Sequence, residues 1–129
     1  MTVVLDSWAA LAVIKREASA MRVLELLGDE QPLMSWINLG EIAYLEERRL
    51  GRLRADEIVD ALARAVRAEL PDVALVRAAA HCKAQGGLSY ADAFAAATAI
   101  RHDADLLTGD DELVALHARD GLRVVDVRH

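Results

Sequence analysis

Four acidic side chains stand at points where an apolar segment gives way to a sequence typical of a helix. They are Asp6 in "VVLDS", Glu41 in "NLGEIAYL", Asp92 in "LSYADAFAAATA" and Asp110 in "LLTGDDEL". Burying a carboxylate is costly unless the charge is paired or bound to a metal ion. Oxygen ligands without cysteine or histidine beside them suit Mg²⁺ or Mn²⁺. The four acids together therefore predict a site for a divalent cation.

Each acid also has a purely local explanation as a helix-capping group. N-cap and capping-box positions account for Asp6 or Ser7, Asn38 with Glu41, Ser89 with Asp92, and Asp110. Acids in the first turn of a helix also suit the helix dipole. For any single acid, capping is the simpler interpretation, and only the set of four favours a shared site.

Asp92 is the acid that best distinguishes a helix cap from a metal ligand. The residues that follow it, "AFAAATAI", contain Thr98 as their only polar side chain, so a helix here is predicted to be buried on all sides. Ala95 and Ala96, one turn beyond Asp92, cannot pair with a carboxylate. A carboxylate confined in this way requires either protonation or a cationic partner.

The elements that would position the acids are strands separated by helices. Apolar runs indicate strands at Thr2 to Leu5, Pro32 to Trp36, Asp105 to Thr108 and Leu122 to Val127. Helical periodicity covers "ADEIVDALARAVRAEL", with Ile58, Leu62, Val66 and Leu70 on one face. In "ELPDVALVRAAAHCKAQGG" a short strand near the start is left open, and a helix is predicted from Asp72 to the Gly86-Gly87 pair.

Strands that alternate with helices predict a parallel sheet with helices on both faces. Ligands of such sheets gather at the carboxyl ends of the strands, and Asp6 and Asp110 directly follow strands. If the helix starts that carry Glu41 and Asp92 meet them there, the four charges repel one another strongly. A bound cation would compensate them.

These motifs resemble those of PIN-domain ribonucleases, specifically the VapC-type toxins of bacterial toxin–antitoxin pairs. The resemblance extends over the whole chain in the order and spacing of all four acidic motifs. It implies an α/β, three-layer PIN-like fold with a central, mainly parallel sheet of about four or five strands and helices on both faces. It also implies one domain over residues 1–129.

The resemblance assigns roles to individual residues. Asp6, Glu41, Asp92 and Asp110 would bind the metal, and Asp111 or Glu112 could share the place of Asp110. Supporting contacts would come from Ser7, Asn38, Thr108, Asp111 and Glu112. The implied reaction is hydrolysis of RNA phosphodiester bonds, in tRNA or rRNA, which would inhibit translation. The implied partners are a cognate antitoxin and a second copy of the chain, with higher assemblies formed with the antitoxin.

Charge is less decisive. The net charge of −6 argues weakly against binding of nucleic acid, but "RRLGRLR" gathers Arg48, Arg49, Arg52 and Arg54. These arginines could follow an RNA backbone, or they could be solvated residues that complement a helix dipole. Trp8, Trp36 and Tyr44 are expected in the core or at an interface rather than as platforms for stacked bases.

Composition limits the remaining classes. No apolar run reaches the ~20 residues needed to cross a membrane, which excludes membrane binding by a spanning helix. Cys82 is the only cysteine, so an internal disulfide and a cysteine zinc cluster are excluded and a reducing cytoplasm fits.

Three alternatives remain open. The first is a related metal-dependent nuclease of RNA maturation or DNA processing without a toxin role. The second is a receiver-type phosphoacceptor domain, which needs a lysine near its C-terminus, whereas the only lysines are Lys15 and Lys83. The third is a degenerate interaction module with the same fold, against which the presence of all four acids counts.

Overall fold

The computed structural model describes residues 2–129, in which helices separate each strand from the next. In chain order the elements are β1 (Val3–Leu5), α1 (Ser7–Ile14), α2 (Ala20–Leu27), β2 (Leu33–Ser35), α3 (Trp36–Leu50), α4 (Arg52–Ala65), β3 (Arg67–Glu69), α5 (Val73–Ala84), α6 (Tyr90–Arg101), β4 (Asp105–Thr108), α7 (Asp111–Val114), the 3₁₀ helix η1 (Arg119–Gly121) and β5 (Arg123–Asp126).

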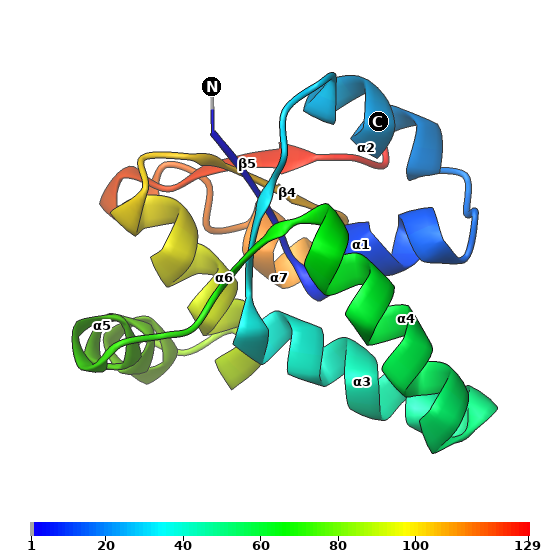
Figure 1. The fold of residues 1–129 in the computed structure, drawn as a ribbon. Coiled ribbons are helices and arrows are strands. Elements are labelled where there is room, and N and C mark those ends of the chain that lie inside the picture. The colour runs from blue at the N-terminus through cyan, green and yellow to red at the C-terminus, as the bar shows by residue number, and fades with distance from the viewer. Residues whose placement is uncertain (1) are drawn as a thin grey trace.

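The five strands form one sheet in the order β3-β2-β1-β4-β5, and every pairing is parallel. β1 lies at the centre, where Val4 is paired with Leu33 of β2 and with Leu106 of β4. Helices lie on both sides of the sheet, with α5 and α6 on one side and α1 and α4 on the other (Figure 1). The predicted α/β fold class is confirmed.

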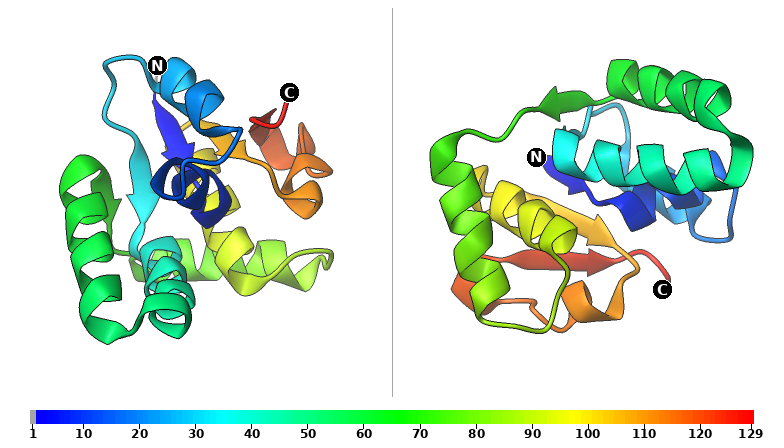
Figure 2. Two further views of the ribbon diagram at one scale, coloured as in Figure 1. Left: turned by 90° about the vertical axis from the view of Figure 1, so that its right-hand side faces the viewer. Right: turned by 90° about the horizontal axis from the view of Figure 1, so that it is seen from below.

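Alternation along the strands divides the core into two layers. Val4 points into a layer with Leu75 and Phe94 of the α5–α6 side. Its neighbours Val3 and Leu5 point into the other layer, with residues of α1 to α4. Side chains of a strand point alternately to its two faces, so a sheet covered on both sides needs apolar residues at every position. Figure 2 shows the sheet between these helices from two further directions.

Two predicted boundaries were wrong. The third helix begins at Trp36, where Ser35 accepts a hydrogen bond from the Ile37 N–H at 3.2 Å, so Asn38 lies inside the helix and is not its cap. The helix predicted to continue through Leu70 ends at Ala65, and β3 follows it because its backbone pairs with β2. Leu70 is accordingly 75% exposed. Among residues 2–129, no helix is both long and apolar enough to span a bilayer.

Candidate metal centre

The acids gather at one edge because of the direction of each element. β1, β2 and β4 are parallel neighbours, so their carboxyl ends share one edge of the sheet. Asp6 follows β1, Asp110 follows β4 after one glycine, and α3, which carries Glu41, begins directly after β2. α6 leads back to the start of β4, so it runs against the strands and its first turn, with Asp92, lies at the same edge.

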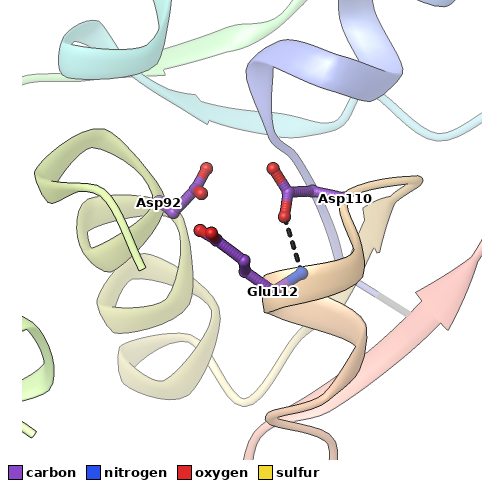
Figure 3. A group of neighbouring side chains, drawn as sticks. All are labelled: Asp92, Asp110 and Glu112. Carbon is purple, nitrogen blue, oxygen red and sulfur yellow. Dashed lines mark hydrogen bonds between the residues drawn. The ribbon is translucent and has the colours of Figure 1, made fainter. Parts of the chain in front are cut away.

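Three carboxylates form the tightest group at this edge. Asp92, Asp110 and Glu112 each offer one oxygen, and these oxygens all lie within 4.8 Å of one another. Figure 3 shows Asp92 on α6 facing the two acids at the start of α7. The Glu112 N–H donates to the Asp110 carboxylate at 2.8 Å, so Asp110 also caps α7. Glu112 thus lies in the same group as Asp92 and Asp110. The sequence had left open whether Asp110 acts alone or together with Asp111 or Glu112.

Asp6 lies beneath this group and is 1% exposed. Its carboxylate accepts the Ala9 N–H at 2.8 Å and the Thr108 hydroxyl. The Thr108 oxygen in turn accepts the Asp110 N–H at 3.0 Å. A chain of hydrogen bonds therefore connects the backbone at Asp110 to Asp6 and fixes the two acids relative to each other.

Burial and mutual repulsion raise the pKa of two acids. Burial raises the pKa of Asp6 to about 7, against the opposing effect of its hydrogen bonds to Thr108 and Ala9. Burial, followed by the charges of Asp110 and Glu41, raises the pKa of Asp92 to about 6. The surrounding protein groups therefore do not fully neutralise the negative charge at this edge of the sheet.

Ser7 and Asn38 hold the helices of the site together. The Ser7 hydroxyl donates to the Asn38 carbonyl oxygen at 3.1 Å, which joins α1 to α3. The Asn38 side-chain NH₂ donates to the Ala91 carbonyl oxygen at 3.0 Å, which joins α3 to α6. Both residues are buried, and they set the spacing between the helices that carry Glu41 and Asp92.

The acids open onto a cleft of about 660 Å³. Glu41, Asp92, Asp110 and Glu112 line it, whereas the buried Asp6 does not belong to its lining. Apolar side chains form another part of the wall: Trp8, Leu11 and Leu45. Sequence reasoning had placed Trp8 only in the core or at an interface, although its position two residues after Asp6 is a signal for the site.

Arg128 at the rim of the cleft was also missed. Its guanidinium bonds to the Asp111 carboxylate at 2.7 Å and to Asp126 at 2.9 Å, and the second contact lowers the pKa of Asp126 to about 2. Asp111 is therefore paired with a cation. Arg128 follows β5 at the same edge, so the rule that found Asp6 and Asp110 could have found it as well.

The arginine cluster predicted to contact RNA lies outside this cleft. Arg48 stands 5.0 Å from the centre of the Tyr44 ring. The other three interact with acids on their own helices: Arg49 with Glu46, Arg52 with Asp56 and Arg54 with Glu57. Among residues 2–129, none of the four belongs to the lining of the cleft.

The donor set fits a hard divalent cation. Carboxylate oxygens from two helices converge, without sulfur or imidazole, as Mg²⁺ and Mn²⁺ prefer. A cation there would also compensate the repulsion that raises the pKa of Asp92.

Replacing Thr108 by valine is expected to lower the free energy of unfolding by about 1–3 kcal/mol, because the half-buried Asp110 N–H and the buried Asp6 carboxylate both lose a partner. Thr108→Ser keeps the hydroxyl and should lose much less. Urea unfolding with EDTA present measures both. Equal unfolding free energies for the two variants would contradict the hydrogen-bond chain.

The metal-free protein is expected to become less stable as the pH rises from about 4 to about 7. The folded-state pKa values of Asp6 and Asp92 lie above the ordinary value, so the folded protein binds more protons in this range. Asp126, with a lowered pKa, acts in the opposite direction only at lower pH. Melting temperatures in EDTA measure the effect, and Mg²⁺ should raise them more at about pH 8 than at about pH 5. A metal-free melting temperature that increases over this range would contradict the expectation.

Comparisons with known proteins identify a family and a fold. The profile of the family described as PIN domain matches residues 3–118. No curated protein sequence matches the chain.

Several solved structures share the fold. VapBC-1 from nontypeable Haemophilus influenzae is 20% identical, with a TM-score of 0.76 and all of both chains covered. DNA-bound VapBC from Salmonella typhimurium is 18% identical, with a TM-score of 0.78 and 98% of each chain covered. VapC20 from Mycobacterium tuberculosis, described as a sarcin–ricin loop cleaving toxin, is 19% identical, with a TM-score of 0.74, and the match covers 92% of this chain and 97% of that one. At these identities the likeness establishes a common fold.

Proposed function

This chain belongs to the PIN domain family, and from that premise we propose that it is a metal-dependent endoribonuclease, the toxin of a toxin–antitoxin pair. The observation that carries the proposal is the convergence of Asp92, Asp110 and Glu112 within 4.8 Å, in a cleft that Glu41 also lines. Mg²⁺ or Mn²⁺ is the proposed cofactor.

Four acids share one task in this proposal, and Asp6 supports them. Asp92, Asp110 and Glu112 supply ligand oxygens from α6 and α7, and Glu41 supplies one from α3. Asp6 is buried below them, where its contacts to Thr108 and Ala9 keep its carboxylate in one orientation. When bound, the cation supplies a hydrolytic nucleophile at neutral pH and offsets negative charge on the phosphate.

Other residues of the chain prepare the site for a phosphodiester. Ser7 and Asn38 fix the spacing of the three helix starts. Arg128 stands at the rim, where it would reach a substrate phosphate only by exchanging its bond to Asp111, which is 86% exposed, while it keeps its bond to Asp126. Farther along α3 and α4, the cluster Arg48, Arg49, Arg52 and Arg54 is proposed to follow the RNA backbone. Arg52 and Arg54 would exchange exposed ion pairs, whereas Arg49 would keep its bonds to Glu46, which is 1% exposed.

RNA as the substrate, and the toxin role, are supported by the structural neighbours. VapC20 is described as cleaving the sarcin–ricin loop, and the Haemophilus and Salmonella proteins are described as VapBC. By analogy we assign this chain an RNA substrate such as tRNA or rRNA, a cognate antitoxin, and a homodimer that joins larger assemblies with the antitoxin. The chain is proposed to act in the cytoplasm as a single domain over residues 1–129.

Cleavage of RNA by the purified protein tests the enzymatic part. Single-stranded RNA and DNA are incubated with the protein and Mg²⁺ or Mn²⁺, with EDTA in parallel. We expect cuts in RNA only, dependent on the metal, with 5′-phosphate and 3′-hydroxyl ends. RNA cleavage that persists in EDTA would remove the mechanism, and cleavage of DNA alone would favour the nuclease of DNA processing.

Brief induction in living bacteria tests the toxin part. We expect growth arrest together with a small set of new 5′ ends in tRNA or rRNA. Harmless overproduction of an enzyme that is active in vitro would instead favour a role in RNA maturation, which the family match alone also permits.

A further inference from the structure

Trp8 is the one large aromatic side chain among the described residues that line the acidic cleft. It lies on α1, two residues after Asp6, and is half-buried. Its inner part packs with the apolar layer of α1 to α4. Trp8 is therefore held by the core and also lines the cleft, where Glu41, Asp92 and Asp110 lie as well.

Gly109 brings this ring close to the reacting centre. A Cβ atom added to Gly109 would stand 2.5 Å from Cη2 and Cζ2 of Trp8 and 2.6 Å from Cε2. The six-membered half of the indole thus lies against the backbone of the residue directly before Asp110. No side chain separates the ring from that backbone.

The charged residues of the cleft offer RNA few attractive ionic contacts, so a contact that is not ionic would help to hold the substrate. Among the described lining residues, Arg128 is the only cation, and it already bonds to Asp111 and Asp126. The acids repel phosphates until a cation is bound. Substrate held only by its backbone would therefore depend on the bound cation alone beside the acids.

Unpaired bases of RNA stack on aromatic side chains, and each such contact contributes about 1–3 kcal/mol. An indole fixed beside Asp110 would meet the base next to whichever phosphate the acids engage. We propose that Trp8 is the base-stacking residue of this enzyme and holds an unpaired nucleobase adjacent to the scissile phosphate. The proposal rests on the endoribonuclease function proposed above and reverses the interpretation of Trp8 as only a core or interface residue.

Kinetics with an abasic substrate test the stacking directly. Wild type, Trp8→Leu and Trp8→Phe are compared on a short single-stranded RNA that contains the mapped cleavage site, and on the same RNA with abasic nucleotides on either side of the cut. On the intact RNA, Trp8→Leu should lower kcat/KM by about tenfold or more, and Trp8→Phe should lower it less. Removing the bases should lower the kcat/KM of the wild type by a similar factor. The kcat/KM of Trp8→Leu should be the same on the abasic RNA as on the intact RNA.

A purely structural role for Trp8 predicts a different result. If Trp8→Leu lowers kcat/KM by the same factor on intact and abasic RNA, the stacking proposal is overturned while the nuclease function stands. If the wild type cuts no RNA with Mg²⁺ or Mn²⁺, the proposed function fails first. Trp36→Leu is the matched control, since Trp36 lies outside the cleft lining, and it should leave kcat/KM unchanged on both substrates.

Fluorescence supplies a readout that does not depend on turnover. The chain has two tryptophans, so Trp36→Phe leaves Trp8 as the only indole. In that background, with Ca²⁺ in place of Mg²⁺ to prevent cleavage while the acids stay intact, the intact RNA should quench the emission of Trp8 and the abasic RNA should quench it far less. Equal quenching by both RNAs would also overturn the stacking.

Discussion

Replacing Asp92 by asparagine is expected to reduce metal-dependent RNA cleavage by at least about 100-fold while making the metal-free protein more stable. The loss follows because Asp92 offers one of the three clustered carboxylates. The gain follows because burial, Asp110 and Glu41 all disfavour the charge of Asp92, whose pKa is raised to about 6. An asparagine at this position carries no charge to disfavour.

Two measurements separate these effects. Melting temperatures near neutral pH should rise from wild type to Asp92→Asn in EDTA, and the order should reverse in saturating Mg²⁺. Asp56→Asn removes the same charge from an exposed site on α4 and should change neither activity nor the response to Mg²⁺. An Asp92→Asn variant that is destabilised in EDTA would show that the carboxylate is needed for folding rather than for a cation.

Replacing Gly109 by alanine is expected to lower the free energy of unfolding by about 1–3 kcal/mol and to reduce cleavage as well. The new Cβ atom would stand 2.5 Å from the Trp8 ring, so the ring or the backbone before Asp110 has to move. Either movement displaces a group that lines the cleft. Chemical denaturation and RNA cleavage measure the two consequences.

Gly40→Ala is a control of opposite sign. Gly40 lies in α3, and a Cβ atom there would meet nothing within 4 Å. Alanine in a helix interior is more favourable than glycine by about 0.5–1 kcal/mol, so this variant should be stabilised. If both glycine variants change stability by the same amount and sign, the contact between Gly109 and Trp8 does not constrain the site.

The position of the acids at one edge of the sheet could be predicted from the sequence, because it follows from the order of strands and helices along the chain. Asp6 directly follows a strand, Asp110 follows one after a single glycine, and parallel strands bring such positions together. The buried alanine helix after Asp92 was equally readable, and Ala93 to Ala99 are indeed buried. The roles of the acids as metal ligands stay predictions.

What the sequence did not reveal depends on contacts between distant segments. Helical periodicity continues through Val66 and Leu70, yet the chain leaves the helix because residues Arg67–Glu69 pair with β2. Asn38 has the spacing of a cap for Glu41, but its amide instead reaches Ala91, which is 53 residues away. Trp8 was assigned from residue type alone, and only the contact with Gly109 places it beside the acids.

The small side chains of the α6 alanines set the distance between α6 and the sheet, which limits the substitutions that this protein can accept. Ala95 and Ala96 are at most 1% exposed and carry no chemistry, but any larger side chain there would push α6, and Asp92 with it, away from the sheet. Natural variation should therefore be as restricted at these methyl groups as at the acids themselves. A collection of inactivating mutations should therefore include substitutions of these alanines, although they do not contact the substrate.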